Sequence, residues 1–241
     1  TLIHIAVKKE NLELCKYLIE HKANPNKEIT GGYYYKGKTA LHIAVELGNL
    51  EISKYLIEHK ADPNKEITGG EHKGKTPLHI AAQEGSIEIC RYLVEENNIY
   101  PDVEIMYGSD KGKTPLHFAS ENGNFKICKY LIEHKADPNK EITSGYYKGT
   151  TPLHFASEKR NLELCKYLIE HKADYNKEKV NGNLKSKITP LGLAKISNCE
   201  DLISYFESLF DHERQKSPSP NLNNPKIEEK ILQGIADKMK R

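Results

Sequence analysis

Thr114-Pro115-Leu116-His117-Phe118-Ala119 (TPLHFA) is the stretch that decides the fold, because it returns unchanged at residues 151–156. Near copies stand elsewhere in the chain: TLIHIA at 1–6, TALHIA at 39–44, TPLHIA at 76–81 and TPLGLA at 189–194. The threonines that open the six copies are separated by 38, 37, 38, 37 and 38 residues. A fixed period of this size indicates a stack of supersecondary units, in which each unit packs against its neighbours.

Each copy of the phrase begins a pair of helical segments. Proline follows the opening threonine in four copies, and it suits the first position of a helix, where its missing N–H costs nothing. Gly48, Gly85 and Gly123 stand where a left-handed residue would end the first helix. Apolar residues then recur at helical spacing through the second segment. Two antiparallel helices with one apolar face each cannot bury those faces alone, so the pairs are expected to stack.

The phrase resembles the T-P-L-H-x-A signature of ankyrin repeats, and six recurrences over residues 1–210 make the match specific. The resemblance implies an all-α repeat solenoid, an ankyrin-type stack of helix-turn-helix units starting near residues 1, 39, 76, 114, 151 and 189. The last unit has Gly192 in place of the histidine and is expected to be a degenerate cap. Lysine also replaces the glycine that ankyrin units usually have near the end of the second helix. These lysines are Lys22, Lys60, Lys135 and Lys172.

The residues between one helix pair and the next predict elongated fingers. The period exceeds the usual ankyrin length of about 33 residues, and the additional residues follow the second helix. Gly31-Gly32, Gly69-Gly70 and Asn181-Gly182 lie between short strand-like runs and are typical two-residue turns. We therefore expect β-hairpin fingers. The third unit differs, because residues 97–101 contain one extra residue and its finger tip is irregular.

The two ends of the chain differ from the repeats. Residues 211–225 contain Ser, Pro and Asn without apolar periodicity, which predicts a flexible linker. Residues 226–241 return to helical spacing and predict an amphipathic C-terminal helix. The sequence begins inside a repeat with Leu2 and Ile3, so we expect it to be a fragment of a longer chain.

Composition narrows the class of partner and the compartment. The net charge is +2, and the 29% of charged residues are of both signs and interleaved, which indicates neither a nucleic-acid nor a membrane surface. No apolar run approaches the roughly 18 residues that span a bilayer. Four of the five cysteines share one repeat position and are expected to be small buried hydrophobic residues. Free thiols favour a reducing compartment, the cytoplasm or the nucleus.

Neither metal binding nor catalysis is expected. One histidine recurs in each copy of the phrase, and in ankyrin-like units it is understood to bridge backbone groups. Ligands of one zinc ion lie about 2 Å from it, so a column spaced by a repeat width cannot converge on one ion. The chain also lacks the G-x-S-x-G, H-E-x-x-H and phosphate-loop motifs. We therefore predict a non-enzymatic protein without a cofactor.

The family resemblance implies that a partner binds the concave side, which is made of the fingers and the ends of the first helices. At the helix ends, the candidate residues are Glu46, Leu47, Gln83, Glu84, Glu121, Asn122, Glu158 and Lys159. At the finger tips, they are Tyr33, Tyr34, Tyr35, Glu71, His72, Tyr107, Tyr146 and Tyr147. Tyrosine offers rigid, amphipathic contact area and is enriched at binding hot spots. The alternative is that these rings pack against adjacent fingers.

Three functions remain open from the sequence. The first is a monomeric adaptor or scaffold that holds a protein partner through the concave face and finger tips. The second is a regulatory or targeting segment of a larger effector, with the C-terminal helix docking in cis or on a second partner. The third is a nucleic-acid-binding array, which predicts strongly salt-dependent binding and which the mixed charges disfavour.

Overall fold

The computed structural model describes residues 1–180 and 187–216, and its helices follow the repeat. The first helices of the units are α1 (Leu2–Lys8), α3 (Ala40–Glu46), α5 (Pro77–Glu84), α7 (Pro115–Glu121), α9 (Pro152–Glu158) and α11 (Pro190–Ile196). The second helices of the first five units are α2 (Leu12–Glu20), α4 (Leu50–Glu58), α6 (Ile87–Arg91), α8 (Phe125–Glu133) and α10 (Leu162–Glu170). In the third unit α6 continues directly as a π-helix, η1 (Tyr92–Glu96).

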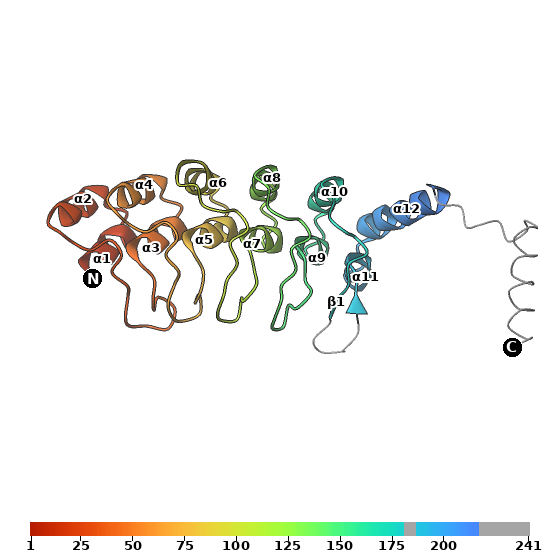
Figure 1. Ribbon diagram of the computed structural model, residues 1–241, viewed down its shortest axis with the longest axis horizontal. Helices are drawn as coiled ribbons and strands as arrows, with labels where there is room; N and C mark the ends of the chain where they lie inside the picture. The colour runs from red at the N-terminus through yellow and green to blue at the C-terminus, as the bar shows by residue number, and fades with distance from the viewer. Residues whose placement is uncertain (181–186, 217–241) are drawn as a thin grey trace, which may run out of the picture. The chain divides into compact units, whose positions relative to one another are not determined.

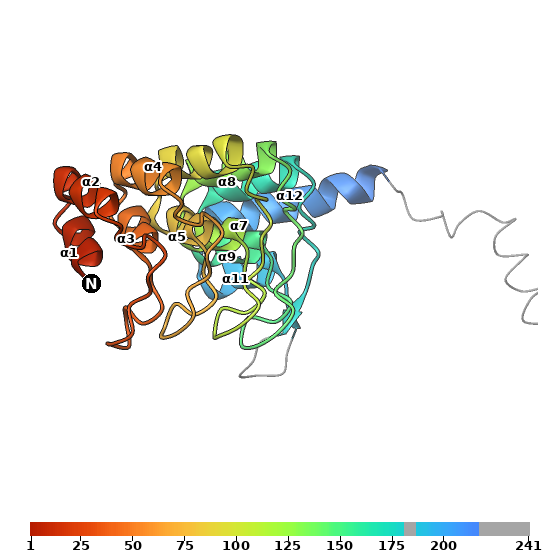
Figure 2. The same ribbon diagram turned by 60° about the vertical axis from the view of Figure 1, so that its left-hand side comes forward.

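The units stack side by side in single file. The first helices contact one another in the order α1, α3, α5, α7, α9 and α11, and the second helices contact one another from α2 to α10. Figure 1 shows these two rows, and Figures 1 and 2 both show the loops between units extending to the same side of the array. The expected all-α repeat solenoid is therefore confirmed for residues 1–199, which form one compact unit.

The repeated phrase forms the start of each first helix. The backbone N–H of Thr39 donates to His42 Nδ1 at 3.0 Å, and the Thr39 hydroxyl lies 2.9 Å from the same nitrogen. The other ring nitrogen, His42 Nε2, lies 2.8 Å from the carbonyl oxygen of Lys65. Because a carbonyl oxygen can only accept, the proton lies on Nε2. This histidine therefore caps its own helix and ties it to the base of the following finger.

His4, His79, His117 and His154 form the same capping boxes in units one, three, four and five. Nε2 of the first three lies near the carbonyl equivalent to that of Lys65, whereas His154 Nε2 lies 3.3 Å from the carbonyl oxygen of Ile188. Burial lowers the pKa of His42, His79 and His154 to about 4 and that of His117 to about 3. These rings are thus neutral parts of the scaffold at physiological pH. Gly192 breaks the column in unit six, where its N–H donates to the Thr189 hydroxyl instead.

The core lies between the two rows of helices and along the unit-to-unit contacts. The leucine of the phrase is at most 1% exposed in units two to five, at Leu41, Leu78, Leu116 and Leu153. The repeated cysteine is buried and free in all four units that have it, as predicted. Burial raises the pKa of Cys128 and Cys165 to about 12, so these thiols pack as small hydrophobic residues.

Lysine occupies a left-handed backbone position in four units. The φ angles are 66° at Lys22 and 72° at Lys60, Lys135 and Lys172. Each lysine therefore carries a conformational cost relative to glycine, on the order of 1 kcal/mol at each site.

The β-hairpin prediction for the fingers is wrong in the first four units, where the structure assigns no strand. Each of these fingers is closed by a single isoleucine. In the first finger the N–H of Ile29 donates to the carbonyl of Lys38 at 2.9 Å, and the N–H of Gly37 donates back to Ile29 at 2.8 Å. Ile67, Ile105 and Ile142 make the equivalent pairs. Beyond this single rung the tips are turns.

A glycine on the returning segment explains why no longer ladder forms. Gly37, Gly74, Gly112 and Gly149 have φ between 78° and 90°, which bends the chain out of the extended conformation. A Cβ atom on Gly37 would lie 2.5 Å from the backbone nitrogen of Gly69 in the next finger. The Lys-Gly-Lys segment thus brings successive fingers close together. Only the fifth finger has strands, β1 (Lys179–Val180) paired antiparallel with β2 (Lys187–Ile188).

Two kinds of polar link join neighbouring units on the finger side. At the finger bases, a glutamate pairs with a lysine of the next finger: Glu28 with Lys65, Glu104 with Lys140, and Glu141 with Lys177. Between fingers two and three Val103 takes the lysine position, so Glu66 has no such partner among the described residues.

The second link is an asparagine side chain that joins two backbone groups of the next unit. Asn26 Nδ2 donates to the carbonyl of Lys60 at 2.8 Å, and Asn26 Oδ1 accepts the N–H of Asp62 at 2.8 Å. Asn139 binds Lys172 and Asp174 in the same way, at 2.7 Å each.

Unit three alters this second link. Its extra residue is absorbed by η1 and by Asn98, which has φ of 54°. Asp102 then stands in the asparagine position. Asp102 Oδ2 accepts the N–H of Asp137 at 2.8 Å, while Asp102 Oδ1 is buried and has no hydrogen-bond partner. Desolvation raises the pKa of this carboxyl.

Residues 200–241 form a second compact unit, of which the helix α12 (Glu200–Lys216) is described. The helix extends six residues into the segment 211–225 that was predicted to be a linker. The remainder of that segment and the predicted helix at 226–241 lie outside the described residues.

Candidate functional site

The predicted surface residues divide into tips that face solvent and residues that contact the groove. We define the groove as the surface between the fingers and the ends of α3, α5, α7 and α9. Tyr33, Tyr107 and Tyr146 are 75%, 58% and 66% exposed at the tips of fingers one, three and four. The remaining exposed candidates are Tyr34, which is 43% exposed, and Leu47, Glu71, Glu84, Asn122, Glu158 and Lys159; the half-buried ones are Tyr35, Glu46, His72, Gln83, Glu121 and Tyr147.

The first finger is held to the groove by the second tyrosine of its tip. The Tyr34 hydroxyl donates to Glu46 Oε1 at 2.7 Å, and its ring makes edge contacts with Tyr35 and His72 at 4.9 Å between centroids. Packing against the adjacent finger therefore applies to Tyr34, whereas the ring of Tyr33 beside it faces solvent. Lys8 lies over the Tyr35 ring at 3.4 Å, so this ring is also engaged.

A row of buried lysines forms the floor of the groove, and sequence reasoning missed it. Lys38, Lys75 and Lys113 directly precede the threonine of the phrase, and each side chain is at most 7% exposed. Each ammonium group bonds to the residue eight positions later, at the end of the first helix. These partners are Glu46 for Lys38, Gln83 for Lys75 and Glu121 for Lys113. The recurrence of Lys-Gly-Lys-Thr was the signal that could have found the row.

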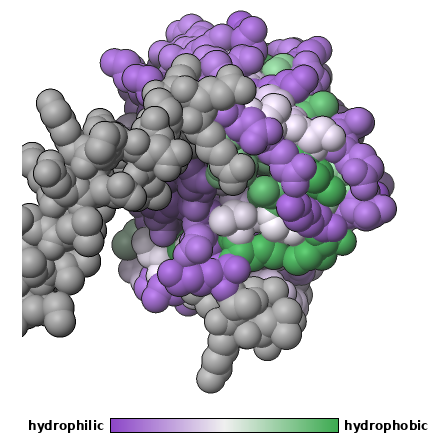
Figure 3. Space-filling view, turned by 90° about the vertical axis from the view of Figure 1, so that its right-hand side faces the viewer, coloured by the Kyte–Doolittle hydropathy of each residue, from purple (hydrophilic) through white to green (hydrophobic). Residues whose placement is uncertain are grey.

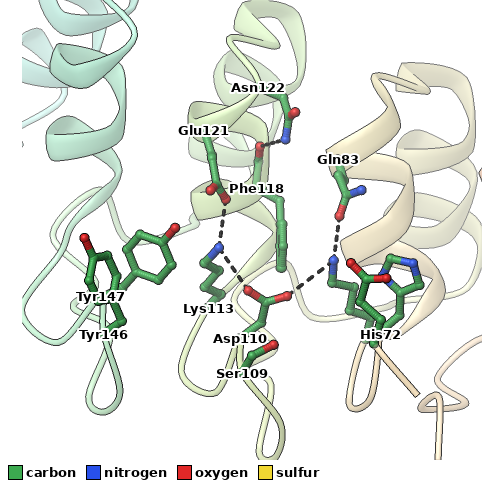
Figure 4. A pocket seen from close by; sticks show the side chains of 12 residues that line it. His72, Gln83, Ser109, Asp110, Lys113, Phe118, Glu121, Asn122, Tyr146 and Tyr147 are labelled. Carbon is green, nitrogen blue, oxygen red and sulfur yellow. Dashed lines mark hydrogen bonds and ion pairs between the residues drawn. The ribbon is translucent and has the colours of Figure 1, made fainter. Parts of the chain in front are cut away.

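Asp110, at the tip of the third finger, joins two of these lysines. Its Oδ1 lies 3.0 Å from Lys113 Nζ and its Oδ2 lies 3.4 Å from Lys75 Nζ. Burial opposes ionisation of Asp110, but the two ammonium groups outweigh it and lower the pKa of the carboxyl. Figure 4 shows the resulting chain of interactions from Gln83 through Lys75, Asp110 and Lys113 to Glu121.

Aromatic rings surround the lysine ammonium groups. Lys113 Nζ lies 4.5 Å from the centroid of Tyr147, and Lys75 Nζ lies 4.5 Å from that of Phe118. Contacts of this kind stabilise a cation by about 0.5–2 kcal/mol. Tyr147 also packs on Phe155, at 5.5 Å between centroids, and so belongs to the wall of the groove.

These side chains line a cavity of about 540 Å³ between fingers two, three and four. Seven of the predicted site residues meet here: Glu71, His72, Gln83, Glu121, Asn122, Tyr146 and Tyr147. Lys75, Ser109, Asp110, Lys113 and Phe118 complete the lining and were not predicted. Leu47, Glu158 and Lys159 are not part of this cavity.

Unit five, which begins at Thr151, departs from the lysine pattern. Thr150 replaces the lysine, and its buried hydroxyl has no hydrogen-bond partner in the described part of the chain. Glu158, the counterpart of Glu46 and Glu121, pairs instead with Lys179 of the fifth finger at 3.7 Å. Among the described residues, the row of buried lysines therefore consists of Lys38, Lys75 and Lys113, which precede units two, three and four.

The second histidine column belongs to the scaffold. His21, His59, His134 and His171 each end a second helix, and Nδ1 of each lies 2.7 or 2.8 Å from the carbonyl oxygen of the tyrosine four residues earlier. Within residues 1–180 and 187–216, no group of three or more His, Cys, Asp and Glu side chains could hold a metal ion.

The surface seen in Figure 3 mixes hydrophilic and hydrophobic residues, with hydrophilic residues along most of its rim. None of the helices in the described ranges combines the length and the apolar character that a membrane crossing requires.

Single-file helix pairs with loops on one side define a helical repeat solenoid. Comparison with known families identifies the type of solenoid. The family of ankyrin repeats (3 copies) matches residues 1–67, 67–142, 102–179 and 139–215. The chain therefore belongs to the ankyrin repeat family. A search of curated proteins gave no significant match. Ankyrin repeats generally mediate protein–protein interaction and are generally non-catalytic.

Proposed function

We propose that this chain is a non-catalytic adaptor or scaffold module that holds one protein partner in the groove and against the finger tips. The observation that carries the proposal is that some tip tyrosines contact the groove, whereas others face solvent. Tyr34 and Tyr147 are anchored in the groove, whereas Tyr33, Tyr107 and Tyr146 project their rings into solvent with no role in the core. Exposed, rigid aromatic rings on a fixed scaffold are typical anchors of a protein interface.

The size of the surface supports the same function. A standard protein interface buries about 800 Å² on each partner, which four or five fingers and the helix ends beside them can supply. The groove charges are balanced in sign, which favours a protein over a polyanion such as a nucleic acid. We also propose that the module works as a monomer in the cytoplasm or nucleus, reducing compartments in which free thiols persist.

The test is capture of the partner from native lysate by the immobilised full chain, with the three exposed tyrosines changed together to serine. We expect capture to fall about tenfold or more while the melting midpoint stays within error, because these rings are more than half exposed. Tyr17→Ser is the matched control, since Tyr17 is 56% exposed on α2, in the row of second helices. Unchanged capture by the triple variant would refute the proposal, and so would an equal loss in the control.

A further inference from the structure

The geometry points to an arginine side chain of the protein partner as the occupant of the cavity between fingers two, three and four. This inference rests on the proposed function and names the chemistry that the groove selects.

The carboxylates of the cavity lie outside its ammonium groups. The side chains of Asp110 and Glu121 are 18% and 25% exposed, whereas those of Lys75 and Lys113 are 7% and 4% exposed. Glu71 is exposed at the rim. An approaching group therefore meets acceptor oxygens first, and the lysines lie beneath them.

The ammonium groups have their own partners and offer little to an anion. Lys113 Nζ bonds to Asp110 and to Glu121, and Lys75 Nζ bonds to Gln83 and to Asp110. Burial and the nearby Lys38 and Lys75 lower the pKa of His72, so this ring adds no positive charge at neutral pH. An acidic ligand would have to displace a carboxylate to reach a lysine.

The carboxylates, in contrast, keep acceptor capacity. A carboxylate has about four lone-pair directions, and the described contacts of Glu121 use only Oε2. Glu121 Oε1 is available to a donor in the cavity. A guanidinium group carries five N–H donors in a planar fork, which suits two carboxylates on one side of a cavity.

The aromatic wall favours arginine over lysine. Tyr146 and Tyr147 meet edge to face at 5.1 Å between centroids, and Tyr146 is mostly exposed. Figure 4 shows both rings on the fourth finger, across the cavity from Asp110 and His72. A planar guanidinium stacks on an exposed ring while bonding at its edge, and a cavity of about 540 Å³ accommodates such a side chain.

Two equivalent positions supply a matched pair of variants. Gln83 and Glu121 both accept a hydrogen bond from the buried lysine eight residues before them, at 2.7 and 2.8 Å. The fold therefore already accommodates glutamine and glutamate at this place. Glu121→Gln removes one negative charge from the cavity, and Gln83→Glu adds one, without removing the bond to lysine in either case.

The test is an NMR titration of the full chain with acetyl-arginine amide, its neutral isostere acetyl-citrulline amide, and acetyl-glutamate amide. We expect arginine alone to shift the amide signals of Asp110, Glu121 and Tyr146. Glu121→Gln should weaken binding about tenfold, the loss of one charge-assisted hydrogen bond, and Gln83→Glu should tighten it several-fold. Glu51→Gln, on the exposed side of α4, should change nothing.

Three results would overturn the inference: equal binding of arginine and citrulline, preferred binding of glutamate, or an affinity for arginine that is unchanged in Glu121→Gln. The first two leave the proposed function standing if the tyrosine-tip variant still loses lysate capture. Because Tyr146 also lines the cavity, a variant of Tyr33 and Tyr107 alone separates the two proposals. Capture that survives this double variant but falls with Glu121→Gln would overturn the role of those tips and support the arginine cavity.

Discussion

Asp102→Asn should stabilise the protein, because unit three carries a carboxylate where the other four units with fingers carry an asparagine, two of which bridge to the next unit. Asn26 and Asn139 each accept one backbone N–H and donate to one backbone carbonyl of the next unit. Asp102 reproduces only the accepted bond, from Asp137. Its Oδ1 is buried without a partner, in the place of the amide nitrogen. By the repeat register, the carbonyl of Lys135 is the counterpart of the Lys60 and Lys172 carbonyls that accept from Asn26 and Asn139.

The expected gain is about 2 kcal/mol at pH 7. One new buried hydrogen bond contributes about 1 kcal/mol, and removing the cost of an unpaired buried acceptor contributes about 1 kcal/mol or more. Asp102 is only 6% exposed, so solvent screens little of this cost.

The gain should depend on pH in a definite direction. Burial raises the folded-state pKa of Asp102 above its ordinary value of 3.8, so the folded chain binds this proton more tightly than the unfolded chain. The wild type therefore loses stability as the pH rises through the raised pKa, and the asparagine variant does not. A protonated Asp102 can donate as an amide does, so the difference between the two proteins should shrink as the pH falls toward 3.8.

Urea unfolding at pH 7 and at pH 5 measures this difference directly. The control is the reverse change, Asn139→Asp, which should destabilise the protein by a smaller amount because Asn139 is half-buried. A urea midpoint for Asp102→Asn that is equal to or below that of the wild type at pH 7 would refute the reasoning. So would a gain that grows as the pH is lowered.

Two further outcomes are expected. Lys135→Gly should raise the free energy of unfolding by about 1 kcal/mol in urea, because φ is 72° there; an Ala substitution at the same place should give no gain, since alanine shares the strain. The melting midpoint should fall as the pH drops from 7 to 5. His42, His79 and His154 have folded pKa values of about 4 against the ordinary 6.5, so the unfolded chain binds more protons between those values and each ring costs about 1.4 kcal/mol per pH unit there. A flat midpoint over that range would contradict the neutral assignment of the rings.

The repeat made most of the fold predictable from sequence. The proline of the phrase acts locally, at the first position of its helix, so its role could be inferred without knowing what packs against it. The histidine reaches a carbonyl 23 residues away as well, and its bridging role was available only from the family resemblance. The burial of the repeated cysteines could also be predicted, because their repeat position lies on the apolar face of the second helix.

The fingers were mispredicted because a local turn signal was given too much weight. Gly31-Gly32 is typical of a two-residue hairpin turn, but Gly37 sets the backbone of the returning segment, and its left-handed φ ends the ladder after one rung. The conformation of Gly37 depends on the close approach of the next finger, which is a contact between units and not a property of the local sequence.

Only part of the candidate site was predicted, because the rest again depends on contacts between segments that are distant in sequence. Tip residues such as Tyr146 could be inferred from their place in the loop. Lys113 was missed, because a single lysine flanked by glycine and threonine in a polar loop resembles a solvated one; only the recurrence of Lys-Gly-Lys-Thr indicated that it is 4% exposed. Its burial depends on Asp110 and Glu121, which approach it from a neighbouring turn and from the far end of a helix.

The junction between units two and three has a mechanical consequence. Among the described residues it lacks both links found at other junctions, since Val103 replaces the pairing lysine and Asn64 makes no bond to unit three. The Lys75–Asp110 contact, at 3.4 Å, spans this joint beside the cavity. We therefore expect the stack to bend at this junction. A ligand bound in the cavity would contact both units and restrict that bending. Occupancy would then be visible far from the contact itself, as slower amide exchange on both sides of the joint.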